Sequence, residues 1–358
     1  MKHRWRMDLN WLCGATASTW HRLRREHGVD AAYAHRAAQI TVLSAYNSAV
    51  RRFDRHPPRP LKRDPVFVLG HWRSGTTWLY HRMAEAPGLT APNAFQVVNP
   101  LTFRASEPVA SRVFAGLVPE KRVQDDVPLG FALPEEDEYA IALLAGTSPY
   151  LGRSFPRALP FYERFLTLDA CTDAERTAFH RAMRVFLGRL MDGADARPLL
   201  KSPAHTARVK HLLRWFPDAR FVHIHRDPFA VFASTRHLYD TVDWFWTLQR
   251  RDGSPDATIL RQYRAVHDAW FASRDLIAPG HLVELAYEDL VADPQGQLDR
   301  VFAGLGLGAA PTVPARPHRA NRFPDLSEAD QDAVRDVAAA CFDAWGYPSR
   351  ARTATGQR

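Results

Sequence analysis

The stretch from residue 66 to residue 79, VFVLGHWRSGTTWL, constrains the fold more than any other part of this sequence. It begins with four apolar residues, continues through a polar loop bracketed by Gly70 and Gly75, and ends in an apolar segment. This order predicts a buried strand at 65–69, a tight turn, and a helix from about 75 to 86. Main-chain N–H groups in such a turn, together with the positive end of the next helix, form a cradle for anionic oxygens. We therefore expect an anion-binding strand–loop–helix unit.

Strand and helix patterns alternate along the rest of the chain. Apolar strand patterns occur in RPLLKSP (197–203), ARFVHIHRDP (219–228) and HLVELAYEDL (281–290). Helices are predicted at about 172–191, from 203 to 216, over FAVFASTRHLY (229–239), and at 257–276, 294–305 and 327–345. Alternating, near-continuous apolar strands predict an α/β fold in which a parallel sheet is covered by helices on both faces, a P-loop-like three-layer sandwich.

The chain divides into three predicted parts. Residues 1–64 are expected to form an N-terminal helical extension, with one or two helices between 15 and 53 and a Pro-rich linker, RHPPRPLKRDP, that cannot continue a helix. The α/β domain is expected at 65–347. Within it, residues 90–165 form an irregular insertion with a helix at 135–145, of the kind that carries specificity at the rim of a sheet. A disordered tail is expected at 348–358.

The charge of the chain limits the classes of partner that it is expected to bind. The net charge of +8 and the pI of about 9.6 favour anionic partners such as nucleic acid, acidic lipid or a phosphorylated small molecule. The RNP, zinc-finger and basic-zipper patterns of nucleic-acid-binding proteins are absent from the sequence, so we expect no nucleic-acid partner. Most arginines between residues 22 and 63 fit a solvated basic face. Oligomeric state is not indicated.

The location of the protein is also constrained. The sequence has no run of about eighteen uncharged apolar residues, so no transmembrane segment is predicted. The N-terminal residues contain no unbroken apolar stretch typical of a secretory signal. Cys13, Cys171 and Cys341 are too widely spaced for a disulfide framework or a zinc knuckle. These features together predict a cytoplasmic protein.

Three basic residues follow predicted strands. Arg73, Lys201 and Arg226 each stand just after a strand, and ligands of parallel sheets bind beyond the carboxyl ends of the strands. We expect the three side chains to converge at one rim.

The loop itself lacks the lysine of nucleotide triphosphatases. Thr76 stands where that lysine would follow the second glycine, and Arg73 precedes this glycine instead. The arginine offers a planar, permanent charge, and Ser74, Thr76 and Thr77 supply hydroxyl donors. This pattern favours one terminal phosphate-like group over a metal-clamped triphosphate. The alternative is an ordinary strand-to-helix connection.

Two segments resemble a known family. Residues 73–79, RSGTTWL, resemble the 5′-phosphosulfate loop of the sulfotransferases that use 3′-phosphoadenosine 5′-phosphosulfate (PAPS). Residues 221–235, FVHIHRDPFAVFAST, resemble the 3′-phosphate motif of that family, in which an arginine after a strand is followed by a serine eight positions on. Here those residues are Arg226 and Ser234. The resemblance covers about residues 65–305.

The resemblance implies a reaction and a set of binding residues. The implied reaction is in-line transfer of a sulfuryl group from PAPS, as co-substrate and without a metal, to a hydroxyl or amine acceptor. The donor would be held by Arg73, Ser74, Gly75, Thr76, Thr77, Trp78, Arg226 and Ser234. Trp78 would stack on adenine, and core packing is its alternative role.

The predicted catalytic groups are cations and one base. Arg73 is expected to stabilise charge on the bridging oxygen of the 5′-phosphate, with Lys201 as a second cation. The base is expected in the run PEEDE, which bacterial sulfotransferases of this kind often show, with Glu136 favoured over Glu138 and His205 as the rival. Alternatively, the acidic residues only complement a helix N-terminus.

Other functions and the acceptor stay open at this stage. A kinase with a deviant loop that uses ATP, and a non-catalytic binder of anionic polymer, are the alternatives. His223 and His225 alternate along a strand as a metal pair would, but buried histidines with protein partners are the preferred interpretation. The acceptor could be a small molecule, carbohydrate, lipid or peptide. Its pocket is expected to draw on Phe95, Phe103, Phe131, Tyr139, Tyr150, Phe155, Arg104, Arg112 and Arg153.

Overall fold

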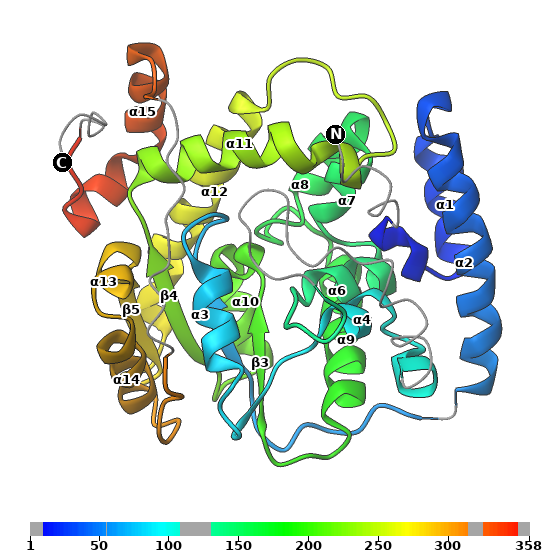
Figure 1. The fold of residues 1–358 in the computed structure, drawn as a ribbon, viewed down its shortest axis with the longest axis horizontal. Coiled ribbons are helices and arrows are strands. Elements are labelled where there is room, and N and C mark those ends of the chain that lie inside the picture. The colour runs from blue at the N-terminus through cyan, green and yellow to red at the C-terminus, as the bar shows by residue number, and fades with distance from the viewer. Residues whose placement is uncertain (1–9, 55, 108–129, 314–324, 350–358) are drawn as a thin grey trace.

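The computed structural model describes residues 10–54, 56–107, 130–313 and 325–349. Its centre is a five-stranded sheet with the strand order β2-β3-β1-β4-β5, and every strand pair in it is parallel (Figure 1). The strands are β1 (Val66–Leu69), β2 (Leu89–Thr90), β3 (Arg197–Lys201), β4 (Arg220–His225) and β5 (Leu282–Ala286). The predicted parallel α/β sheet is therefore confirmed.

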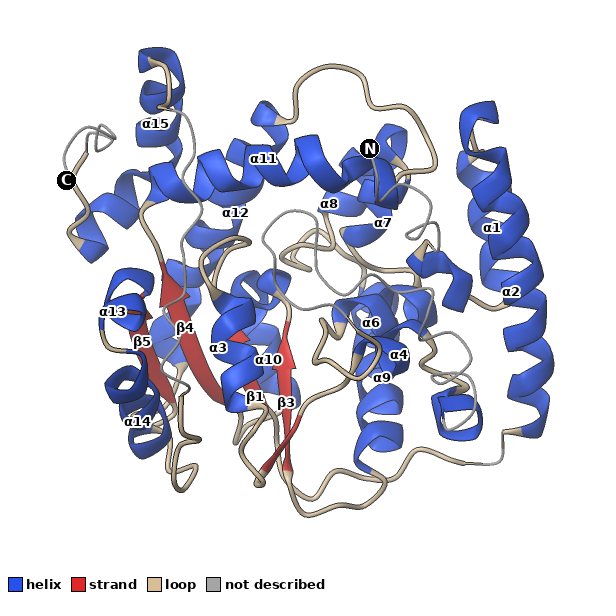
Figure 2. Cartoon of the chain, in the orientation of Figure 1, coloured by secondary structure: helices blue, strands red, loops and turns tan. Residues whose placement is uncertain are grey.

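Helices cover both faces of the sheet, because successive side chains of each buried strand point to opposite sides (Figure 2). Val66 and Val68 face one layer of helices, and Phe67 and Leu69 face the other. The first layer consists of α3 (Thr76–Met83), α13 (Tyr287–Ala292) and α14 (Pro294–Gly304). The second includes α9 (Asp173–Met191), α10 (Val209–Trp215) and α12 (Asp256–Ser273). The result is the predicted three-layer sandwich.

The N-terminal residues form a separate pair of helices at the edge of the molecule (Figure 1). They are α1 (Ala17–His27) and α2 (Ala34–Phe53), preceded by the short helix η1 (Trp11–Gly14). The two helices are joined by Trp20 Nε1, which donates to Thr41 Oγ1 over 2.8 Å. Both helices lie within residues 15–53, where the sequence predicted one or two helices.

The remaining helices surround the rim. They are α4 (Ala94–Val98), α6 (Glu138–Ala145), α7 (Tyr150–Ser154), α8 (Leu159–Glu163), α11 (Pro228–Trp246) and α15 (Glu328–Trp345). Short 3₁₀ helices lie at η2 (Ala31–Tyr33), η4 (Pro156–Ala158), η5 (Pro203–Arg208) and η6 (Arg274–Leu276). Among the helices that the structure describes, none has the length and hydropathy needed to cross a bilayer.

The start of α9 is explained by its sequence. Thr172 accepts a hydrogen bond from the main chain of Glu175, and the Glu175 side chain accepts one from the Thr172 N–H. This capping box satisfies two N–H groups that have no partner inside the helix. The predicted start of this helix is confirmed.

Several predicted elements are wrong in extent. The helix predicted at 229–239 continues to residue 246. The helix predicted at 135–145 begins only at Glu138, since Pro134 forms an isolated antiparallel bridge with Asn93 and residues 135–137 are a loop and turn. The strand predicted at 281–290 ends at residue 286, where Glu288 and Asp289 favour the first turn of α13. The helix predicted from 203 to 216 is split into η5 and α10. The predicted tail lies outside the described residues from residue 350 onward.

Candidate active site

The first loop depends on its two glycines. Gly70 has a φ of 142° and Gly75 a φ of 98°, and both values fall in the region that favours glycine. A Cβ on Gly70 would lie 2.4 Å from the carbonyl oxygen of Ile224, and one on Gly75 would lie 2.6 Å from Cδ2 of Tyr287. Glycine at both positions therefore lets the loop approach the neighbouring strand and helix closely.

Arg73 is strained and joins the two sequence motifs. Its φ of 71° is left-handed, which costs a non-glycine residue about 1–3 kcal/mol and is typical of functional sites. Its Nε donates to Ser234 Oγ over 2.9 Å, and Nη1 of Arg226 donates to the Arg73 carbonyl over 3.0 Å. Two segments separated by about 150 residues of chain thus meet at one point of the rim, as the sequence predicted.

The second motif is built by the turn from β4 into α11. The Asp227 side chain accepts from the N–H of Phe229 over 2.8 Å and caps the helix. Arg226 packs over the Tyr287 ring at 4.2 Å, and burial lowers the pKa of its guanidinium. Its Nε is buried and has no hydrogen-bond partner among the described residues. A buried, unsatisfied N–H of a cation fits an anionic group bound at this place.

The predicted loop hydroxyls play different parts. Ser74 is buried, and its hydroxyl donates to the carbonyl of His71 over 2.7 Å, so it holds the loop together. Thr76 is also buried. Thr77 Oγ1 accepts from Lys201 Nζ over 3.4 Å and therefore lies at the rim. Trp78 is half-buried and packs against the apolar cluster between α3 and the sheet, which agrees with its alternative, packing role.

Lys201 and Glu136 form the second part of the site. Lys201 stands at the end of β3 with only 1% of its surface exposed, and its Nζ lies 2.6 Å from Glu136 Oε1. The hydroxyl of Tyr150 donates to Glu136 Oε2. Trp72 Nε1 in turn donates to the Tyr150 hydroxyl over 3.3 Å. Glu136 is thus held between a cation from the sheet and a phenol from α7.

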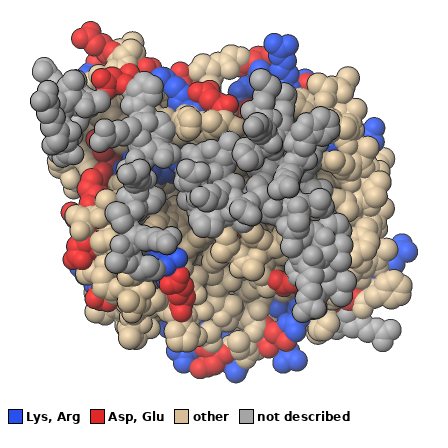
Figure 3. Space-filling model, in the orientation of Figure 1, with Lys and Arg blue, Asp and Glu red and all other residues tan. Residues whose placement is uncertain are grey.

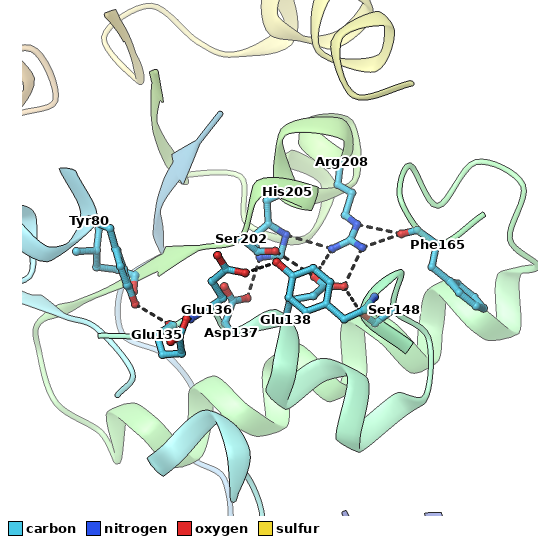
Figure 4. A network of polar contacts seen from close by, with 12 residues as sticks. Tyr80, Glu135, Glu136, Asp137, Glu138, Ser148, Phe165, Ser202, His205 and Arg208 are labelled. Atoms are coloured by element: carbon cyan, nitrogen blue, oxygen red, sulfur yellow. Dashed lines mark hydrogen bonds and ion pairs between the residues drawn. The ribbon is translucent and has the colours of Figure 1, made fainter. Parts of the chain in front are cut away.

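Two further acidic residues of PEEDE, Asp137 and Glu138, have other partners (Figure 4). His205 Nε2 lies 2.8 Å from Asp137 Oδ2, and both side chains are buried. Glu138 is fully buried and receives two hydrogen bonds from Arg208, at 2.6 and 3.0 Å. The geometry therefore favours structural roles for Glu138 and His205 over the predicted role as a base.

The acidic run is anchored to α3 by main-chain contacts. The Tyr80 hydroxyl donates to the Glu135 carbonyl over 3.2 Å, and His81 Nε2 donates to the Pro134 carbonyl over 3.0 Å. Since α3 starts at the first loop, these contacts fix the position of Glu136 relative to that loop.

Arg153 lies beside Glu136 within a group of aromatic rings. Its guanidinium carbon is 5.3 Å from the Trp72 ring centre, 5.3 Å from Tyr150, 5.8 Å from Tyr239 and 5.2 Å from Trp246. The Tyr239 hydroxyl is buried and has no hydrogen-bond partner among the described residues. We call these four rings and Arg153 the aromatic wall.

Sequence reasoning found only part of the aromatic wall. It named Tyr150 and Arg153 but missed Trp72, Tyr239 and Trp246. Two signals were available: Trp72 adjoins the loop arginine, and the other two are seven residues apart on one helix, which places them on one face.

Of the other residues proposed for the pocket, Tyr139 adjoins the aromatic wall and the remaining described ones lie elsewhere. Tyr139 contacts the Tyr150 ring at 5.1 Å. Phe95 and Phe103 are buried in a small cluster between α4 and α9, Phe131 packs on that cluster, and Phe155 is in the main core. Arg104 pairs with Asp192, away from the wall. Arg112 is outside the described residues.

The two histidines of β4 have protein partners. His223 Nδ1 lies 2.8 Å from Glu284 Oε2, and His225 Nδ1 lies 2.9 Å from the Tyr347 hydroxyl. The His225 ring stacks on Trp345 with centres 4.5 Å apart. Within residues 10–54, 56–107, 130–313 and 325–349, no three His, Cys, Asp or Glu side chains gather as metal ligands.

Comparison with known proteins identifies the family to which this sequence is similar. Residues 65–311 match the model of the sulfotransferase family. The chain is 34% identical over 308 residues to omega-hydroxy-beta-dihydromenaquinone-9 sulfotransferase Stf3 of Mycobacterium bovis and of Mycobacterium tuberculosis, a match that covers 82% of this chain and 78% of each relative.

Solved structures share the fold. Sulfotransferase STF9 from Mycobacterium avium superposes with a TM-score of 0.65 at 15% identity, over 94% of this chain and 98% of that one. Sulfotransferase STF1 from Mycobacterium tuberculosis superposes with a TM-score of 0.61 at 18% identity, over 88% of this chain and 84% of that one. With the two predicted motifs joined at one rim and a matching family model across the whole sheet, the chain belongs to the sulfotransferase family.

Proposed function

We propose that the rim formed by the first loop, Arg226 and Ser234 binds PAPS, and that Glu136 accepts the proton of a hydroxyl on a lipid acceptor. Membership of the sulfotransferase family implies PAPS as the sulfate donor. Family membership also argues against the two alternative functions, an ATP-dependent kinase and a non-catalytic polymer binder.

Donor binding is supported most directly by the contacts of Arg226. Its buried Nε lacks an acceptor among the described residues, and its neighbour Ser234 is already joined to Arg73. A phosphate at this place would supply the missing acceptor and give the two guanidinium groups a common anion. At the other end, the loop from Gly70 to Gly75 and the start of α3 offer main-chain N–H groups to the 5′-phosphosulfate.

The proposed sulfuryl transfer needs little covalent catalysis by the protein. Sulfuryl transfer, like phosphoryl transfer, depends on alignment of the reacting groups and on stabilisation of developing charge. Arg73 is the proposed cation for the departing 5′-phosphate. Lys201 is the proposed cation for the oxygens of the sulfuryl group, because it stands between Thr77 and Glu136.

Glu136 is the proposed general base because of its position. It is the one carboxylate of the PEEDE run that contacts Lys201, and 14% of its side chain is exposed. Glu138 and Asp137 are at most 1% exposed and are paired with Arg208 and His205. A base must come within hydrogen-bond distance of the proton that it accepts, and carboxylates withdrawn from the surface as far as those of Asp137 and Glu138 are less accessible to an acceptor than that of Glu136.

The acceptor is proposed to be a hydroxylated lipid. Stf3, the relative at 34% identity, is named for a hydroxylated menaquinone. The aromatic wall beside Glu136 is the apolar group against which such an acceptor would pack, and its rings Trp72, Tyr150 and Tyr239 are at most 7% exposed. The cytoplasm stays the proposed location, because Cys13, Cys171 and Cys341 are buried as free thiols.

Two measurements test the proposal. Calorimetry should show that adenosine 3′,5′-bisphosphate binds more tightly than ATP with Mg²⁺, and that the Arg226→Ala/Ser234→Ala variant loses most of this affinity. Radiolabelled PAPS should then be offered with an ω-hydroxylated isoprenoid quinone, a phenol and a sugar. Equal nucleotide affinity in the variant would reject the donor site. Faster transfer to the phenol or the sugar would reject the lipid acceptor.

A further inference from the structure

Helix α2 exposes an apolar stripe that the catalytic site does not explain. The helix has 20 residues, and Val42, Tyr46 and Phe53 on it are 69%, 48% and 81% exposed. Their spacings of four and seven residues place them on one side of the helix. Six large hydrophobic side chains are exposed in the part of the chain that the structure describes, and three of them belong to this stripe.

The stripe is distinct from the side of α2 that holds the helix to the protein. That other side buries Ile40, Ser44 and Asn47, and Asn47 Nδ2 donates to the Cys13 carbonyl over 2.8 Å. Exposed small residues widen the stripe without adding charge; they are Ala34, Ala38, Ala45 and Ala49. An apolar stripe along a whole helix is typical of a surface that is covered by a partner.

The surroundings of the stripe are basic. Residues 34–53 contain no Asp or Glu, and Arg51 and Arg52 are exposed in the last turn. The adjacent helix α1 exposes Arg24 and Arg25. None of these four arginines has a carboxylate partner in the described part of the chain. In the space-filling view, blue side chains interrupt a tan surface at the right-hand edge, where Figure 1 places α1 and α2 (Figure 3).

We propose that the stripe on α2 and its arginines dock the protein on the anionic surface of a lipid bilayer. Apolar side chains along one face, with cations beside them, are the pattern of helices that lie in a membrane interface. Arginines near an anionic lipid surface add electrostatic attraction. A second copy of the chain on the same stripe would bring the unpaired arginines of the two copies together, and their repulsion disfavours a dimer.

The docking helix is connected to the acceptor side of the site. Nη1 of Arg36, in the first turn of α2, donates to the carbonyl of Thr247 over 3.1 Å. In the sequence, Thr247 directly follows Trp246 of the aromatic wall. Because Arg36 belongs to the buried side of α2, a bilayer bound along the stripe would lie across this helix from the segment that carries Trp246. The inference rests on the proposed lipid acceptor only for the reason why the protein would dock. The exposed stripe and its arginines are observed independently of that acceptor.

Vesicle sedimentation with the full chain tests the inference. Vesicles of phosphatidylcholine with about 30% phosphatidylglycerol should bind the wild type, pure phosphatidylcholine should bind it weakly, and binding should fall as salt is raised. The triple variant Val42→Ser/Tyr46→Ser/Phe53→Ser should bind anionic vesicles at least tenfold more weakly. Phe161→Ser is the matched control, because Phe161 is 50% exposed on α8, outside the stripe, and should bind as the wild type does.

Two results would overturn docking. One is equal vesicle binding by the wild type and the triple variant, or no binding by either. The other is a dimer in analytical ultracentrifugation that the triple variant dissociates. Transfer to a detergent-dispersed acceptor, measured without vesicles, separates this inference from the proposed function. If transfer persists without vesicle binding, only docking fails. If vesicles are bound but no lipid is sulfated, only the proposed acceptor fails.

Discussion

Lys201 Nζ lies 2.6 Å from Glu136 Oε1, and this contact joins the carboxyl end of β3 to the acidic run before α6. The two residues are separated by 65 positions in the sequence. The contact holds a cation and a carboxylate next to each other, one beside Thr77 of the loop and the other beside Tyr150 of the aromatic wall. Positions fixed before substrate binds reduce the entropy lost on reaching the transition state.

Glu136→Gln should lower kcat by roughly 10²- to 10⁴-fold, the usual contribution of a general base. The affinity for adenosine 3′,5′-bisphosphate should not change, because the donor groups are intact. Single-turnover assays with labelled PAPS and calorimetry measure the two quantities. Glu135→Gln is the matched control, and it should keep most of its activity. A Glu136→Gln enzyme as fast as this control would show that another group accepts the proton.

Arg73→Ala should cost about 3–4 kcal/mol of transition-state stabilisation, the size of a lost oxyanion donor, seen as a fall in kcat/KM of about 10²- to 10³-fold. Arg73→Lys should recover part of the loss, since it keeps the charge but cannot present the same planar group to Ser234. Steady-state kinetics on both variants measures the effect. Near wild-type rates for Arg73→Ala would remove this residue from the chemical step.

Arg208→Met should destabilise the protein by about 3–5 kcal/mol, because it leaves the buried Glu138 without its partner. Urea unfolding measures this loss. The double variant Glu138→Leu/Arg208→Met should be less destabilised than the single one, since the uncompensated charge is gone. Arg264→Met provides the control: Arg264 is half exposed and pairs with an exposed Asp336, so its loss should cost less than about 1 kcal/mol.

Stability should fall as the solution is acidified from pH 6.5 toward pH 4. Burial lowers the pKa of His71 and of His225 to about 4, whereas an unfolded chain has histidine pKa values of about 6.5. Between these values the unfolded chain binds protons that the folded chain does not, so stability is fully present above pH 6.5 and decreases below it.

Each such histidine contributes a slope of up to about 1.4 kcal/mol per pH unit to the free energy of unfolding. His225→Gln should therefore reduce the difference in unfolding free energy between pH 7 and pH 5, measured in urea. His21→Gln, at an exposed residue of α1, should leave that difference as it is in the wild type. An unchanged difference in His225→Gln would mean that the pKa of this ring is the same in the folded and the unfolded chain.

Local sequence patterns were sufficient for the elements that depend on neighbouring residues. The loop between Gly70 and Gly75 needs only a strand, a turn and a helix, and Thr172 and Glu175 form their capping box across one helical turn. The partnership of Arg226 with the first loop followed from a general property of parallel sheets, whose carboxyl ends meet at one rim.

Tertiary structure decided which acidic residue contacts Lys201 at the end of β3. Glu136, Asp137 and Glu138 are consecutive and chemically alike, so no periodicity distinguishes them. Their partners Lys201, His205 and Arg208 lie 65, 68 and 70 positions away. Only the packing of β3 and η5 against the start of α6 pairs each acid with its own basic partner. Of these three acids Glu136 is the most accessible, with 14% of its side chain exposed, whereas Asp137 and Glu138 are at most 1% exposed.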